Sequence, residues 1–174
     1  MPVPGYRGAM AQITQLESKL AEVLGLAQAA QQATKKVAHL AKGEKELVAL
    51  LDRMNAEAKE TEKRCKALAE KRDGKKTAIN RKARETKAEA AEMMNAYLSG
   101  DDVDALDGFE FLIMAEAGEL GHWEIVKTMA AKAKDRPLVR LADWATPIQQ
   151  GHLEAVRTSS LKLAEDEDPN ETEG

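Results

Sequence analysis

The stretch VDALDGFEFLIMAEAGELGHWEIVKTMAAKAK, residues 103–134, contains no proline and repeats apolar residues at intervals of three and four, the spacing of one face of an α-helix. It follows Ser99-Gly100-Asp101-Asp102, whose Ser and Asp side chains can accept hydrogen bonds from the free N–H groups of a first helical turn. This stretch therefore predicts a long helix. On a helical wheel, His122 points to the middle of an apolar stripe made of Phe111, Ala115, Gly118, Ile125, Val126 and Met129.

Helices are also predicted on both sides of this stretch. Asp135-Arg136-Pro137 forms a tight connection to a helix over residues 137–163, in which Pro147 should cause a kink or remove one hydrogen bond. Toward the N-terminus, residues 9–42 and 44–72 form two helices separated by a glycine. Because both connections are short, each pair of helices must return antiparallel as a hairpin.

The two hairpins, residues 9–72 and 103–164, are joined by a long charged crossover over residues 73–102, which we expect to contain a short helix. One long crossover is typical of ferritin-like four-helix bundles. A long two-hairpin coiled coil is the alternative, although strict heptads are not sustained. We therefore predict an all-α, ferritin-like four-helix bundle as a single domain over 9–164, with a flexible leader at 1–8 and a disordered acidic tail at 165–174.

Composition supports an all-α protein and argues against several classes of function. Aromatic residues make up only 3% of the chain, and its net charge of −4 does not call for a polyanionic partner. The basic segment 71–87 has no aromatic side chain for base stacking, so we expect no nucleic acid. Cys65 is the only cysteine, which excludes an intramolecular disulfide and a Cys-based zinc site. No apolar run is long enough for a membrane span and the N-terminus lacks a signal core, so we expect a soluble cytoplasmic protein.

Two of the three histidines lie on apolar helix faces, each three residues after a polar side chain. Glu119 precedes His122, and Gln149 precedes His152. Di-iron and di-manganese bundles use Glu-x-x-His on two helices, with one more Glu from each of the other two. The pattern therefore predicts a metal site for iron or manganese, formed by Glu119, His122, His152 and Gln149, with Glu57 or Glu17 from the first hairpin.

The same pattern also fits a hydrogen-bonded network that holds no metal, because buried histidines often pair with a neighbouring Glu or Gln. This interpretation is favoured because Gln149 is a neutral and poorer ligand than a carboxylate. Gly118 and Gly121 flank His122 and imply close helix packing, in preference to room for a ligand. Met114, Met129 and Cys65 are interpreted as core residues.

Three segments resemble the YciE/YciF-type ferritin-like stress proteins: Glu60-Thr61-Glu62-Lys63-Arg64 through Leu68, the segment 81–94, and AEAGELGHWEI at 115–125. The resemblance covers the layout of residues 16–163. It implies a ferritin-like fold, often dimeric, with a role in the general stress response, and it carries over His122 and Glu124. Gly121 stands where the family favours a glutamate, and Gln149, Gln150 and Gly151 stand where it tends to have consecutive glutamates.

These departures remove carboxylates, so we expect a non-catalytic stress-associated protein that forms homodimers through helical faces, with a degenerate metal site or a polar network around His122 and His152. The alternative is a di-metal carboxylate oxidoreductase or metal-storage protein that uses Glu119-x-x-His122. An elongated helical adaptor is a third and weaker hypothesis, because an adaptor does not need inward histidines.

Overall fold

The computed structural model describes residues 11–173, and in this part of the chain all regular structure is helical. The predicted all-α class is therefore confirmed. The elements are α1 (Gln15–Leu40), α2 (Lys45–Glu70), α3 (Lys76–Leu98), α4 (Ala105–Lys132) and α5 (Arg136–Glu165). The predicted leader at 1–8 lies outside the described residues. Residues 166–173 follow α5 as exposed turns and coil.

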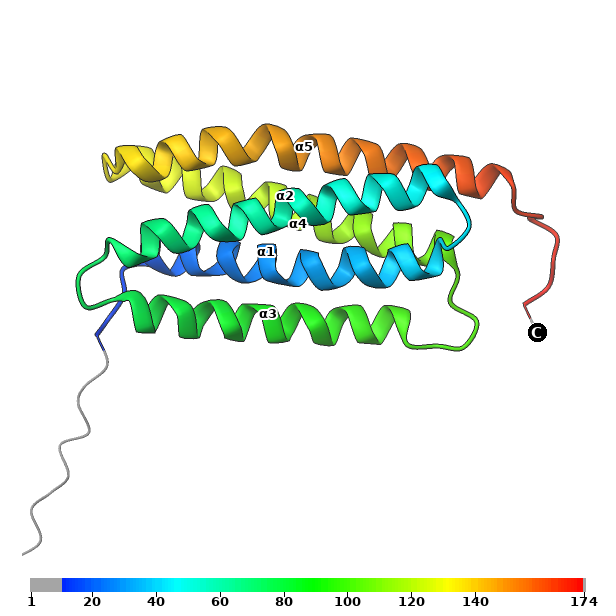
Figure 1. Ribbon diagram of the computed structural model, residues 1–174, viewed down its shortest axis with the longest axis horizontal. Helices are drawn as coiled ribbons and strands as arrows, with labels where there is room; N and C mark the ends of the chain where they lie inside the picture. The colour runs from blue at the N-terminus through cyan, green and yellow to red at the C-terminus, as the bar shows by residue number, and fades with distance from the viewer. Residues whose placement is uncertain (1–10, 174) are drawn as a thin grey trace, which may run out of the picture.

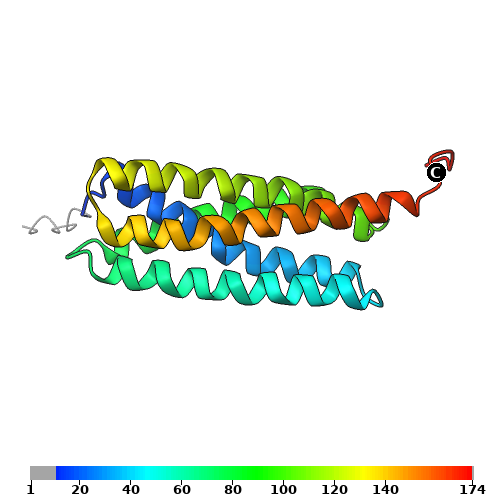
Figure 2. The same ribbon diagram turned by 90° about the horizontal axis from the view of Figure 1, so that it is seen from above.

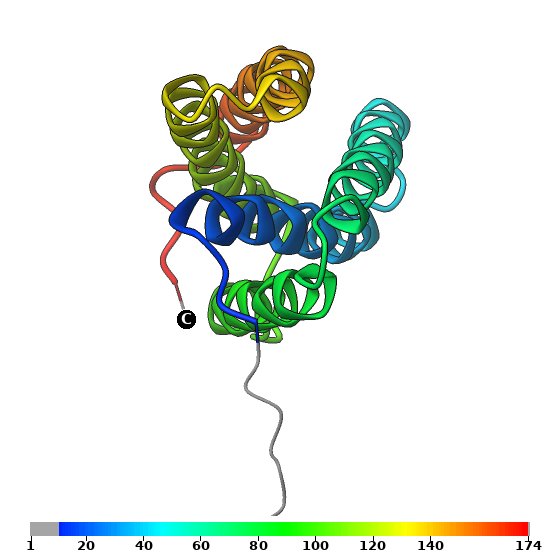
Figure 3. The same cartoon turned by 90° about the vertical axis from the view of Figure 1, so that its left-hand side faces the viewer.

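The helices lie side by side along one long axis, and each runs antiparallel to the one before it (Figure 1). Helix α1 lies in the centre and packs against α2, α3 and α4, as the end-on view shows (Figure 3). Helix α5 packs along α4 and makes a smaller contact with α2 (Figure 2). The hairpins α1–α2 and α4–α5 thus face each other, while α3 covers the outer side of α1. No helix in the described range is long and apolar enough to cross a membrane.

The crossover between the hairpins differs from the expectation of a short helix. Helix α3 has 23 residues and extends along most of α1. Its buried side chains Ile79 and Ala83 face α1 at a close approach, because a Cβ atom on Gly25 would lie 2.4 Å from the carbonyl oxygen of Ala83. The crossover is therefore a packed element of the fold and not a loose connection.

Local signals explain where the helices begin and end. Thr14 and Asp104 each accept a hydrogen bond from the backbone N–H three residues later, and the Glu or Asp at that position bonds back to the cap. Helix α4 therefore starts after Asp104 and not directly after the predicted Ser99–Asp102 signal. Helix α1 ends at Leu40, and Gly43, with φ of +98°, lies in the short turn that leads to α2.

Pro147 lies inside the last helix without ending it. Helix α5 is continuous from Arg136 to Glu165. Proline has no N–H to donate, and the carbonyl it would have bonded belongs to Asp143, which is exposed. Water can satisfy that carbonyl, so the helix continues.

The core consists of two main apolar clusters with a polar layer between them. One cluster lies toward the start of α1 and includes Leu20, Leu24 and Trp123. The other lies toward the end of α1 and includes Val37 and Phe109. Between them, the buried positions of α4 and α5 are polar, those of α1 are alanines, and α2 contributes one of each kind: Glu116, Glu119, Gln149, His152, Ala27, Ala30, Ala58 and Thr61. The middle of the bundle is therefore the place to look for chemistry.

Candidate functional site

Helix α4 supplies two carboxylates to the polar layer. Its buried residues alternate at intervals of three and four: Phe109, Leu112, Glu116, Glu119, Trp123, Val126 and Ala130. Glu116 and Glu119 are therefore in the middle of the buried stripe. His122, one residue before Trp123, lies to the side of this stripe, and its side chain is 38% exposed. The expectation that His122 marks the centre of the buried face is wrong.

The physical reason is that α4 has apolar residues on nearly every side. Ile125, a member of the predicted stripe, is exposed, whereas Trp123, which is not a member of it, is fully buried. Met114 is also exposed, against the expectation that it packs in the core, whereas Met129 packs against the first cluster. A wheel cannot fix the phase of such a helix from hydrophobicity alone.

His152, on α5, is the centre of the polar layer, as expected, with its side chain only 6% exposed. Its Nδ1 atom lies 3.4 Å from Oε2 of Glu116 on α4, and its Nε2 atom lies 3.5 Å from Oε1 of Glu57 on α2. One imidazole therefore stands between carboxylates from two other helices. We call Glu57, His152 and Glu116 the central triad.

The central triad favours a charged histidine. Burial alone would lower the pKa of His152, but the carboxylates of Glu116 and Glu57 outweigh it and raise this pKa above its ordinary value of 6.5. The imidazolium form has N–H donors at both ring positions and no lone pair. Each ring nitrogen then has a carboxylate as its nearest partner.

Glu119, unlike His152, favours its uncharged form. Burial and the nearby charge of Glu116 raise the pKa of Glu119 well above the ordinary value of 4.5. Burial, together with the charges of Glu119 and Glu62, also raises the pKa of Cys65 on α2. Cys65 is thus a buried, unreactive thiol, as the sequence predicts.

Several polar atoms of the layer have no hydrogen-bond partner. The triad contacts are ion pairs without hydrogen-bond geometry, which leaves Nε2 of His152 and Oε2 of Glu116 unpartnered. Oε1 of Gln149, in the turn before His152, is also buried and unpartnered. Such atoms are uncommon in native interiors and often mark sites where something else binds.

The structure separates the residues predicted to share one metal site. Nδ1 of His122 lies 2.8 Å from the carbonyl oxygen of Gly118, and its Nε2 lies 3.6 Å from Oε2 of Glu22 on α1. Glu17 is at the start of α1, where it caps the helix and pairs with Lys75 at 2.8 Å. Among the predicted residues, only Glu57 contacts His152, and Glu119 and Gln149 belong to the same layer. Within residues 11–173, no group of three or more His, Cys, Asp or Glu side chains is arranged to hold a metal ion.

Glu116, the partner of His152, is not among the residues predicted from the sequence to form the site. The spacing held a usable signal: Glu116 lies seven residues after Phe109 and seven before Trp123. Residues seven positions apart lie on the same face of a helix, so Phe109 and Trp123 share a face with Glu116. Two large aromatic residues at this spacing identify the buried face better than single aliphatic residues.

The two glycines beside His122 do not provide the expected close helix packing. A Cβ atom on Gly118 or Gly121 would meet nothing within 4 Å. Helices approach closely instead at Gly25 and at Gly108, where a Cβ would lie 2.9 Å from Cγ1 of Val37.

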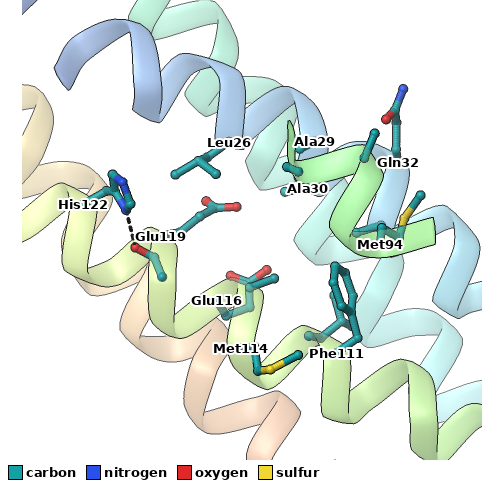
Figure 4. A pocket seen from close by; sticks show the side chains of 16 residues that line it. Leu26, Ala29, Ala30, Gln32, Met94, Phe111, Met114, Glu116, Glu119 and His122 are labelled. Atoms are coloured by element: carbon teal, nitrogen blue, oxygen red, sulfur yellow. Dashed lines mark hydrogen bonds between the residues drawn. The ribbon is translucent and has the colours of Figure 1, made fainter. Parts of the chain in front are cut away.

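Near Gly118, a cavity of about 130 Å³ lies between α1, α3 and α4. Figure 4 shows Glu116, Glu119 and His122 along its α4 wall, with Leu26 and Ala30 of α1 opposite. Two buried carboxyl groups thus border both the central layer and this cavity.

Comparisons with models of protein families, with curated proteins and with solved structures find no match to this chain.

Proposed function

We propose that this chain is a non-catalytic ferritin-like helical-bundle protein, in which a buried ion network occupies the place of a metal site. The observation that carries the proposal is the central triad: one imidazole between carboxylates of two other helices, in the middle of the bundle. Di-metal bundles place their inward carboxylates and histidines at the same depth.

The connectivity supports the ferritin-like part of the proposal. Two hairpins with short loops are joined by a connection that runs along the bundle, so α4 starts at the same end as α2 (Figure 1). A single long crossover of this kind is the connectivity of ferritin-like folds. Helix α3 is then the crossover, enlarged into a helix of its own.

The geometry of His152 supports a network in preference to a metal site. A metal ion binds the lone pair of a neutral imidazole. Both ring nitrogens of His152 face carboxylates, and the raised pKa favours the form in which both carry protons. In this state the ring has no lone pair to offer, and its positive charge pairs with the carboxylates of Glu57 on α2 and Glu116 on α4.

The alternative, a metal-dependent oxidoreductase or metal-storage protein, has one observation in its favour. Unpartnered atoms of Glu116, His152 and Gln149 are all oxygen or nitrogen atoms of types that bind iron or manganese. An ion would have to displace the proton from His152 to use them.

Metal analysis distinguishes the two functions. We expect protein purified without chelator to contain no stoichiometric iron, manganese or zinc, and its melting temperature to be unchanged by EDTA. The substitutions His152→Leu and His39→Leu form a matched pair, because His39 is exposed. Bound metal that is lost in His152→Leu but kept in His39→Leu would establish the metal-dependent function instead.

We also propose the homodimer and the stress association that the family resemblance implies. Exposed apolar side chains on α3 and α4 support the dimer: Met93, Tyr97 and Met114. The ring of Tyr97 lies 6.0 Å from that of Phe111, which connects these two helices at the surface. Large apolar side chains exposed on adjacent helices are typical of subunit interfaces.

A further inference from the structure

The cavity between α1, α3 and α4 is not explained by the central triad. We propose that it is a binding site for a small amphiphilic amine, a compound with one ammonium group and a hydrocarbon body about the size of a benzene ring. Glu116 is shared between the two sites, because its Oε2 atom lies 3.4 Å from Nδ1 of His152 in the central triad and the residue also lines the cavity.

The walls of the cavity fit a hydrocarbon body. Small side chains from α1 and α3 leave the space open, including Ala30 and Ala33 on one side and Ala90 and Ala91 on the other. Phe111 and neighbouring residues of α4 close it. A volume of about 130 Å³ is close to that of an engineered apolar cavity of roughly 150 Å³ that binds benzene.

The carboxyl groups at one end of the cavity fit an ammonium group. Figure 4 shows Glu119 and Glu116 on the α4 wall, directed toward α1. Both residues are more than nine-tenths buried; Glu116 already pairs with His152, whereas burial beside Glu116 raises the pKa of Glu119. No described lysine or arginine lines the cavity to balance a charge on Glu119, and His122 is the one basic side chain among its lining residues. A bound ammonium group would supply the missing donors and countercharge.

This combination distinguishes an amine from other ligands. A carboxylic acid would place a like charge beside two buried carboxyl groups, which is unfavourable. A bare divalent cation needs about six oxygen ligands, whereas most of the lining is Ala, Leu, Met and Phe. A neutral alcohol would fill the apolar part but leave the countercharge missing.

The test compares three ligands of matched size by calorimetric titration of the full chain: benzylamine, benzyl alcohol and benzoate. We expect benzylamine to bind with a Kd between about 10 µM and 1 mM, in line with the number of its atoms. Benzyl alcohol should bind at least about tenfold more weakly, and benzoate should not bind.

Two variants and one control locate the site. Glu119→Gln keeps the shape of the side chain but cannot form the carboxylate that would pair with an ammonium group, so benzylamine affinity should fall at least about tenfold, the effect of one lost charged hydrogen bond. Ala90→Leu should fill the cavity and abolish binding. Glu124→Gln, on the exposed face of the same helix, should leave affinity unchanged. Circular dichroism of each variant confirms that it is folded.

Three results would each overturn the proposal: equal affinity for the amine and the alcohol, unchanged benzylamine binding in Glu119→Gln, or no saturable binding of benzylamine to the wild-type chain.

Discussion

At the residue scale, the two histidines predicted to act together have different surroundings. His152 lies between two carboxylates in the interior, whereas His122 is partly exposed and bonds to its own helix through Gly118. The burial of His152 could be predicted because α5 is clearly amphipathic. The position of His122 could not, because a shift of one residue along α4 moves a side chain by about 100°.

Loss of His152 should be costly. In His152→Leu, the Glu116 carboxylate, nearly fully buried, loses its counter-ion, and we expect the free energy of unfolding to fall by about 3–5 kcal/mol. Urea denaturation measures this change. The double variant His152→Leu/Glu116→Gln should recover part of the loss, since the buried charge is gone. If the double variant loses the sum of the two single effects, the residues do not act as a pair.

Stability should fall as the pH rises above mildly acidic values. The folded pKa values of Glu119 and His152 are raised above 4.5 and 6.5, so both groups bind protons more tightly in the folded state. The stability that each group contributes is fully present when the pH is below its ordinary, unfolded-state pKa. It is lost as the pH rises through the pKa of the folded state. Glu17 and Glu62 have lowered pKa values, so their contributions disappear as the pH falls below about 4.5.

The substitution Glu119→Gln tests how much Glu119 contributes to the pH dependence of stability. The variant should be more stable than wild type at pH 8, where the wild type must hold a proton or bury a charge, and similar to it near pH 4. Melting curves across this range provide the measurement, with Glu124→Gln as the exposed control. A wild-type-like pH slope in Glu119→Gln would refute the assignment.

At the element scale, the helices differ in how far their sequences determine their packing. The ends of α2 and α5 lie within two or three residues of the predicted bounds, because glycine, proline and aspartate signals fix them. Helix α3 was expected to be short, since its sequence is charged and offers few apolar residues. Its burial depends on Ile79 and Ala83 against a glycine of α1, a contact between distant segments that local pattern does not reveal.

The close approach of α1 and α3 can be tested with a glycine pair. In Gly25→Ala, the new Cβ would lie 2.4 Å from the Ala83 carbonyl oxygen, so the helices must separate, at a cost of about 1–3 kcal/mol. In Gly151→Ala, the new methyl meets nothing within 4 Å, and helix propensity should add about 0.5–1 kcal/mol. Thermal denaturation compares them. If Gly25→Ala is as stable as wild type, α3 does not pack on α1 as described.

At the scale of the whole molecule, two apolar clusters enclose a polar layer that no single helix defines. The sequence predicted the all-α class and the inward position of His152, but it also predicted an inward His122, which is partly exposed. It could not predict which groups meet, because Glu57, Glu116 and His152 come from three helices whose relative rotation depends on packing. Glu17 shows the same limit: it was a candidate metal ligand, but it contacts Thr14 and Lys75 at the end of the bundle, away from His152.

The proposed homodimer predicts a measurable mass. Sedimentation equilibrium should give about twice the chain mass of 19.0 kDa. Tyr97→Lys places a charge among the exposed apolar side chains of α3 and α4 and should shift the protein to monomer, whereas Glu89→Lys, on an exposed position of α3, should not. A wild-type monomer would contradict the dimer and leave the fold unaffected.

The charge state of His152 tests the central claim most directly. Nitrogen-15 NMR of histidine side chains, assigned by the signals that disappear in His152→Leu, reports the protonation of both ring nitrogens as a function of pH. We expect both ring nitrogens to be protonated at neutral pH, with an apparent pKa above 6.5. We also expect the nitrogen-15 signals of His152 to stay the same when Mn²⁺ is removed from the sample or Zn²⁺ is added to it. A neutral His152 ring at neutral pH, or a ring nitrogen that shifts on binding Zn²⁺, would contradict the ion network and favour a metal site.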